Sequence, residues 1–267
     1  MAKVCLMCLS SCRPNTINRS HSDSRTQITT LLFDCDNTLV LSEDLAFEAC
    51  AELINKIAAS KGMETNYTGS SLIKDFVGQN FRGMLTTLKK EKNLDISDEE
   101  METYVMQEED AVINKLKVSL VACKGVDEQL QKLHGKYEMA VVSSSAFRRL
   151  RAALDKVGQD QYFTEANTFS AATSLPRPTS KPDPAIYIHA LQTLGKTAEE
   201  AVAIEDSKSG TLSGSRAGIK VVGYTGPYPI EEKEEKKELL LQSGAVVVMD
   251  DWSEFPEILA KIEAGEI

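Results

Sequence analysis

The stretch TTLLFDCDNT, residues 29–38, joins a short apolar run to two carboxylates two residues apart. The run from Thr29 to Phe33 does not alternate between polar and apolar residues, which is typical of a strand covered on both faces in a parallel sheet. Asp34 and Asp36 follow it directly. Two carboxylates this close repel each other unless a cation or phosphate chemistry makes use of them. The stretch therefore predicts a buried strand with a polar site at its carboxyl end.

Further apolar runs of the same kind follow along the chain. They cover residues 138–142, 201–204, 219–223 and 245–249. Helical stretches separate these runs, so the pattern is strand, helix, strand, and the sheet should be mostly parallel. The sequence therefore predicts an α/β fold, and it contains no internal repeat.

One interval, residues 44–120, breaks this rhythm because it has helical periodicity and no good strand. Ser97 and Glu100 form a capping-box pattern at the start of its last long helix. We therefore expect an all-helical subdomain over residues 44–120, inserted after the first strand. The parallel core would comprise residues 29–43 and 121–267.

Composition excludes several classes of protein. With 42% hydrophobic and 26% charged residues, the chain is neither disordered overall nor membrane-spanning. Its net charge of −10, without a basic stripe, argues against a nucleic-acid partner. We expect a soluble, cytoplasmic protein with no membrane span. The sequence leaves its oligomeric state open.

The first 28 residues differ from the rest of the chain, because basic and small polar residues surround three clustered cysteines, Cys5, Cys8 and Cys12. We expect a disordered tail here. The apolar stretch 4–9 is shorter than a signal peptide needs. A metal-binding or acylated tail is the less favoured alternative, since no second ligand pair lies nearby.

Four short polar segments stand at the ends of predicted strands or before helices, where an open α/β sheet places its ligand site. They are residues 34–38, 142–145, 180–184 and 204–207. Each alone is a weak signal, because such triplets are usually turns, caps or solvated loops. Together they supply four acids, one lysine and several hydroxyls, which a Mg²⁺-assisted phosphoryl transfer through an aspartyl-phosphate requires.

With these motifs, the sequence resembles the haloacid dehalogenase-like superfamily over residues 29–259. DCDNT matches the family's DxDx[TV] motif, and the serine after the second strand, the lysine and the Glu-Asp pair match its other motifs. The insertion resembles the small helical cap of the subgroup that contains beta-phosphoglucomutase and phosphoglycolate phosphatase. The resemblance implies a Rossmann-like core with an inserted cap.

The resemblance also implies roles for the motif residues. Asp34 would attack phosphorus, and Asp36 would protonate the leaving oxygen and then deprotonate water. Asp34, the backbone carbonyl of Asp36, and Asp206 would hold Mg²⁺, with Glu205 bound directly or through water.

The phosphoryl oxygens would be bound by three residues of the second and third segments. Ser143 and Ser144 lie at the end of the second strand, and Lys181 precedes a helix. Lys181 would balance the charge of the transition state. The expected partner is therefore a small phosphorylated substrate.

Three reactions share this scaffold in the family. Dehalogenases need no Mg²⁺ and lack the second aspartate, so dehalogenation is disfavoured. Mutases carry a histidine where this chain has Ala46, so a mutase is a weaker alternative. A phosphatase of a small phosphomonoester, such as a sugar phosphate, is the favoured function. A catalytically silent interaction protein is the least favoured, because all four acids are present.

Substrate choice should depend on the cap segment 76–83. Arg82 is the candidate to meet a second anionic or hydroxyl-rich part of the substrate. A lipophilic terpenyl or prenyl phosphate is an alternative, because Phe76, Phe81 and Leu85 would line an apolar pocket.

Overall fold

The computed structural model describes residues 27–76 and 79–267. The predicted tail with Cys5, Cys8 and Cys12 lies outside the described residues, apart from its last two positions. Ile28, which the sequence assigns to this tail, is buried in the core. The packed part of the chain therefore already includes the residue before Thr29.

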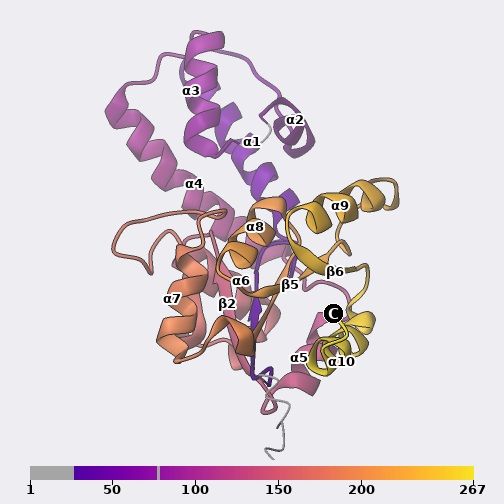
Figure 1. Ribbon diagram of the computed structural model, residues 1–267. Coiled ribbons are helices and arrows are strands. Elements are labelled where there is room, and N and C mark those ends of the chain that lie inside the picture. Colours follow the sequence, from indigo (N-terminus) through magenta and orange to yellow (C-terminus); the bar gives the residue numbers. More distant parts are fainter. Residues whose placement is uncertain (1–26, 77–78) are drawn as a thin grey trace, which may run out of the picture.

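A six-stranded parallel sheet forms the centre of the molecule (Figure 1). Its strands are β1 (Thr30–Phe33), β2 (Glu138–Ser143), β3 (Thr168–Ser170), β4 (Ala201–Glu205), β5 (Lys220–Tyr224) and β6 (Ala245–Met249), in the order β3-β2-β1-β4-β5-β6. The predicted α/β class with a parallel sheet is confirmed. The short edge strand β3 was not expected, because three residues carry too little periodicity to be recognised.

Both faces of the sheet are covered, as the apolar strands predict. Leu31 and Phe33 of β1 join one core cluster with α5 (Val126–Leu133), α6 (Phe147–Val157) and α10 (Phe255–Ala264). Leu32 points the other way and joins a second cluster with α7 (Ala185–Leu194). Two further helices, α8 (Lys208–Arg216) and α9 (Ile230–Gln242), contact β5. The continuous apolar runs therefore follow from burial on both faces.

Four helices form a separate layer beyond the carboxyl ends of the strands (Figure 1). They are α1 (Glu43–Ser60), α2 (Gly69–Asp75), α3 (Phe81–Glu91) and α4 (Asp98–Ser119), and we call this layer, residues 43–119, the cap. Ile54, Leu85 and Leu116 are buried within it. The predicted capping box of Ser97 and Glu100 is confirmed at the start of α4.

Two chain segments connect the cap to the sheet, and they are hydrogen-bonded to each other. The backbone nitrogen of Leu41 donates to the carbonyl of Val121 at 3.0 Å, and that of Cys123 donates to Leu39 at 2.9 Å. This pairing places the cap over the sheet edge where the carboxyl ends of β1, β2 and β4 meet. No helix within residues 27–76 and 79–267 is long and apolar enough to cross a membrane.

Candidate active site

A tight turn follows β1 and shapes the first acidic motif. The carbonyl of Cys35 accepts hydrogen bonds from the backbone nitrogens of Leu39 (2.9 Å) and Val40 (3.1 Å). Asn37 has a φ of +56°, a left-handed conformation that Asn tolerates better than most residues. Cys35 is buried in the core, whereas Asp34 and Asp36 both border a cavity. The turn thus places both carboxylates on the same side of the loop.

Lys181 connects the ends of three neighbouring strands. Its Nζ donates to Oδ1 of Asp34 at 2.6 Å, to Oε1 of Glu205 at 2.6 Å and to the carbonyl of Val142 at 2.8 Å. Lys181, Asp34 and Glu205 are all buried. Burial alone would lower the pKa of Lys181, but the two carboxylates outweigh it and raise that pKa. The lysine is therefore a fixed cation.

A group of three buried carboxylates fits a divalent cation. One oxygen from each of Asp34, Glu205 and Asp206 lies within 4.8 Å of the others. Burial, followed by the negative charge of the neighbouring acids, raises the pKa of Asp206, and burial raises the pKa of Asp34 to about 7 although Lys181 opposes it. Such an arrangement needs a cation or a proton. All-oxygen donors are the ligands that Mg²⁺ prefers, and it usually keeps several waters.

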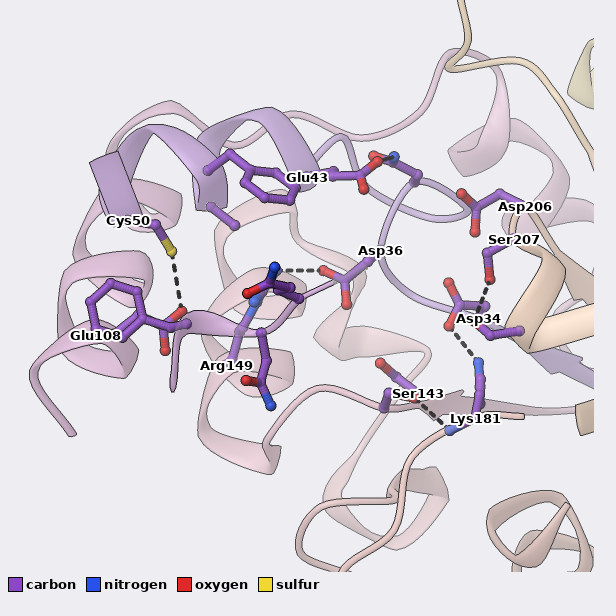
Figure 2. Close-up of a pocket in the computed structure, with 18 of the residues that line it drawn as sticks. Asp34, Asp36, Glu43, Cys50, Glu108, Ser143, Arg149, Lys181, Asp206 and Ser207 are labelled. Carbon is purple, nitrogen blue, oxygen red and sulfur yellow. Dashed lines mark hydrogen bonds and ion pairs between the residues drawn. The ribbon is translucent and has the colours of Figure 1, made fainter. Parts of the chain in front are cut away.

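Asp36 points away from this group, so the two acids of the first motif have different surroundings (Figure 2). Its carboxylate accepts hydrogen bonds from Ser145 Oγ at 2.6 Å, from Ser42 Oγ and from Arg149 Nη2 at 3.1 Å. Burial would raise the pKa of Asp36, but Arg149 and the two hydroxyls outweigh it and lower that pKa. Sequence reasoning missed Arg149 and Ser145 as neighbours of Asp36.

The two predicted serines lie at the end of β2 and the loop that follows it. Ser143 Oγ accepts from the backbone nitrogen of Ser145 at 3.0 Å, and Ser144 Oγ accepts from that of Lys181 at 3.1 Å. Ser143, Ser144 and Lys181 border the same cavity as Asp34. The structure therefore brings together all the acidic, hydroxyl and cationic residues predicted for the core.

The cavity of about 400 Å³ lies between this edge of the core and the cap. Its cap side is formed by Glu43, Ala46, Phe47, Cys50, Gln79, Asn80, Phe81, Met84 and Glu108. The Sγ of Cys50 donates to Oε1 of Glu108 at 3.6 Å (Figure 2). Ala46, the position where mutases of the resembled subgroup carry a histidine, is part of this wall.

The predicted specificity segment reaches the cavity only in part. Gln79, Asn80 and Phe81 border the cavity, whereas Val77 and Gly78 lie outside the described residues. Arg82 is not among the lining residues. Its Nη1 and Nη2 donate to the two carboxylate oxygens of Glu102, each at 2.6 Å, in an exposed pair. The structure therefore does not bring Arg82 to the other site residues.

Of the three aromatic or aliphatic residues expected to line an apolar pocket, one borders the cavity. Phe81 does so, but Phe76 and Leu85 are buried inside the cap, where Phe76 packs on Tyr67. Phe47 and Met84 supply the remaining large apolar surface of the cavity. The cavity therefore has an apolar wall, but most of the residues that form it differ from those expected.

Two further residues support the acids, and both escaped the sequence analysis. Tyr228 borders the cavity and donates its hydroxyl to Oδ2 of Asp206 at 2.8 Å. Gly210 lies against Glu205, since a Cβ at this position would be 1.7 Å from Oε2 of that glutamate. A single tyrosine in a loop and a single glycine in a helix give no sequence signal of such contacts.

Comparison with known proteins shows which family and which enzymes this chain resembles. Residues 31–224 match the family model of haloacid dehalogenase-like hydrolases. A phosphorylated carbohydrates phosphatase of Thermotoga maritima is 29% identical over 220 residues, which are 82% of this chain and 93% of that protein. A 6-phosphogluconate phosphatase of Escherichia coli is 26% identical over 195 residues, which are 73% of this chain and 81% of that protein.

Among solved structures, a putative beta-phosphoglucomutase from Thermotoga maritima has a TM-score of 0.67 and 26% identity, and the match covers 88% of this chain and all of that chain. The chain therefore belongs to the haloacid dehalogenase-like hydrolase family. The family match and the phosphatases among the relatives confirm the predicted enzyme class, a phosphoric monoester hydrolase.

Proposed function

We propose that this protein is a Mg²⁺-dependent phosphatase that hydrolyses a small phosphomonoester, a sugar phosphate or similar metabolite, through a phosphorylated Asp34. The observation that carries the proposal is the contact of Asp34 with Lys181 beside Glu205 and Asp206. This arrangement holds a carboxylate nucleophile next to a fixed cation. The phosphorylated carbohydrates phosphatase among the relatives supports the same substrate class.

The proposed reaction has two steps, phosphorylation of Asp34 and hydrolysis of the phosphorylated enzyme. Lys181 fixes one oxygen of Asp34 and places its positive charge beside the phosphoryl group, and the other oxygen of Asp34 attacks phosphorus while Ser143 binds a phosphoryl oxygen. Asp36, held by Arg149 and two hydroxyls, gives a proton to the leaving oxygen and afterwards takes one from water. Asp34, Glu205 and Asp206 would hold Mg²⁺, which would offset the negative charge of these carboxylates and of the phosphoryl group.

Water is the proposed final acceptor rather than a second sugar hydroxyl. Ala46 offers neither charge nor a hydrogen bond to the cavity, and neither His134 nor His189 of the described residues lines it. We also propose that the cap, predicted from the sequence as residues 44–120, closes over the core by bending at the two connecting segments and so excludes bulk water during the reaction.

The nucleophile assignment is tested by Asp34→Asn, measured with para-nitrophenyl phosphate in the presence of Mg²⁺ and again with EDTA. We expect turnover to fall by at least about a thousandfold, because the amide is nearly isosteric but cannot form the acyl phosphate. EDTA should abolish the wild-type activity. Asp160→Asn, the same substitution at an exposed aspartate outside the cavity, should retain full activity.

The outcomes separate the alternatives. Appreciable activity in Asp34→Asn with an intact circular-dichroism spectrum would contradict the proposed nucleophile. Phosphate moved between positions of a sugar phosphate faster than it is released would favour a mutase. Absence of turnover in the wild type would favour the silent interaction protein, and a preference for a prenyl monophosphate would favour the lipophilic substrate class.

A further inference from the structure

The described residues on the cap side of the cavity include acidic side chains and no basic one. Of the nine described cap residues that line it, Glu43 and Glu108 are acidic and none is a lysine, arginine or histidine. Asn37 Nδ2 donates to Glu43 at 2.6 Å, which contributes no countercharge. A ligand that extends from the core into the cap therefore meets two carboxylates, amides and apolar side chains.

Among the described residues, the two cations that line the cavity belong to the core, and each contacts a carboxylate. Lys181 contacts two carboxylates, and Arg149 donates to Asp36 at 3.1 Å. The positive charge of Arg149 also opposes the rise in the pKa of Glu108 that burial causes. Arg149 thus faces one carboxylate on the core side and one on the cap side, which together offset its single positive charge, and its buried Nε has no hydrogen-bond partner among the described residues.

The arginine that could have supplied a positive charge from the cap is engaged elsewhere. Arg82 forms its two hydrogen bonds with Glu102 in an exposed pair, and it is not among the cavity residues. None of the described cap residues that line the cavity therefore offers a positive charge to a carboxylate or a second phosphate. A site for a doubly anionic substrate would need a positively charged group at this place.

The phosphoryl group of a substrate is fixed at Asp34, Ser143 and Lys181, so its leaving group must extend toward the cap. A second anionic group there would either be repelled by ionised Glu108 or force Glu108 to take up a proton, and both alternatives cost free energy. An uncharged leaving group avoids this cost. It can instead contact the apolar side chains of Phe47, Phe81 and Met84.

We infer that the substrate is the monophosphate ester of a small uncharged alcohol, and that Glu108 is a specificity-determining residue that rejects leaving groups with a second anionic group. The inference rests on the proposed phosphatase function and narrows its substrate class. It separates this protein from relatives such as the 6-phosphogluconate phosphatase, whose named substrate carries a carboxylate.

Matched pairs of esters test the inference, because each pair differs only in one terminal group. The pairs are 2-hydroxyethyl phosphate with phosphoglycolate, and sorbitol 6-phosphate with 6-phosphogluconate. In each pair a hydroxymethyl group replaces a carboxylate. We expect kcat/KM to be at least about tenfold higher for the uncharged member of each pair, which corresponds to about 1.4 kcal/mol.

Glu108→Gln identifies the source of this discrimination. It removes the negative charge and keeps the shape, so it should raise kcat/KM for the anionic member relative to the uncharged one by at least about threefold. The ratio within a pair cancels any effect on the chemical step through Arg149. Glu99→Gln, at an exposed position of the same helix outside the cavity, should leave the ratio unchanged.

Each outcome has a distinct meaning. Hydrolysis of para-nitrophenyl phosphate together with equal or greater kcat/KM for the anionic esters would overturn the inference but not the proposed function. A ratio that Glu108→Gln leaves unchanged would overturn the role of Glu108. If the protein hydrolyses neither para-nitrophenyl phosphate nor any of the four matched esters, both the proposed function and the inference are overturned.

Discussion

Arg149 lies between Asp36 on the core side of the cavity and Glu108 on its cap side (Figure 2). Its neighbour Arg148 is exposed and pairs with Glu109 and Asp110 on α4, at 3.6 and 2.9 Å. Two adjacent arginines on α6 therefore have different surroundings, because successive residues of a helix point about 100° apart. Arg149 contacts Asp36, the proposed general acid and base, whereas Arg148 lies on the surface.

Arg149→Met should lower kcat roughly tenfold to hundredfold, because Asp36 loses the cation that orients it. Arg149 holds the pKa of Asp36 below its ordinary value, so its removal raises that pKa. Asp36 must be ionised to activate water, and the acidic limb of the pH profile should accordingly move to higher pH. Steady-state kinetics between about pH 3 and 8 measure both effects.

Arg148→Met is the matched control for this prediction. It removes the same charge from the next residue, and we expect kcat and the pH profile to stay within about twofold of the wild type, as for most surface ion pairs. An equal loss of activity in both variants would mean that α6 was destabilised rather than that Asp36 was mispositioned.

At the scale of elements, the junction between β4 and α8 determines where Glu205 lies. Glu205 is the last residue of β4, and its Oε1 accepts from Lys181 and from the hydroxyl of Tyr187. Its Oε2 is buried without a hydrogen-bond partner among the described residues and lies against Gly210. The first turn of α8 can approach this carboxylate only where no Cβ intervenes.

Gly210→Ala should therefore destabilise the protein, although alanine normally favours a helix over glycine by about 1 kcal/mol. The added Cβ would be 1.7 Å from Oε2 of Glu205, and such overpacking costs about 1–3 kcal/mol. Displacement of Glu205 should also weaken Mg²⁺ binding. Urea unfolding and calorimetric Mg²⁺ titration measure the two effects separately.

A double-mutant cycle with Glu205→Ala isolates this contact. In the Glu205→Ala background the obstructing carboxylate is gone, so Gly210→Ala should be neutral or stabilising. If Gly210→Ala is equally destabilising in both backgrounds, the clash with Glu205 is not its cause.

At the scale of the whole molecule, the buried acids couple metal binding to the stability of the fold. The pKa of Asp34 is raised to about 7, and that of Asp206 is also raised. The folded metal-free protein therefore binds more protons than the unfolded chain between about pH 4 and 7, and these groups make it less stable as pH rises through this window. A bound cation removes this loss of folding stability.

Mg²⁺ should consequently raise the melting temperature by a few degrees at saturating concentration, and more at pH 8 than at pH 6, where protons compete for the same oxygens. Differential scanning fluorimetry at both pH values measures this without any substrate. Asp206→Asn should lose the shift. Asp36→Asn should keep it, because the Asp36 side chain is not part of the carboxylate group.

Unchanged melting temperatures on addition of Mg²⁺ at both pH values would contradict the proposed metal site. A shift that survives in Asp206→Asn would place the cation elsewhere. Neither result depends on knowing the physiological substrate.

The sequence by itself determined the fold class, the family and the polar residues at the strand ends. These follow from local signals: apolar runs without alternation predict buried parallel strands, and the carboxyl ends of parallel strands share one edge. This rule places Asp34 beside Glu205 and Asp206, whereas Lys181, which follows no predicted strand, was placed in the site by its motif and the family resemblance. The capping box of α4 is likewise local, and it was predicted correctly.

Only the tertiary structure decided what surrounds those residues. Whether Arg82 or Arg149 borders the cavity depends on how the cap packs on the core and on the phase of α6, which no motif encodes. The contacts of Tyr228 with Asp206 and of Gly210 with Glu205 likewise join residues through space. The charge of a cavity is a sum over side chains from many segments, so the absence of a cation on its described cap side emerged only when the chain was folded.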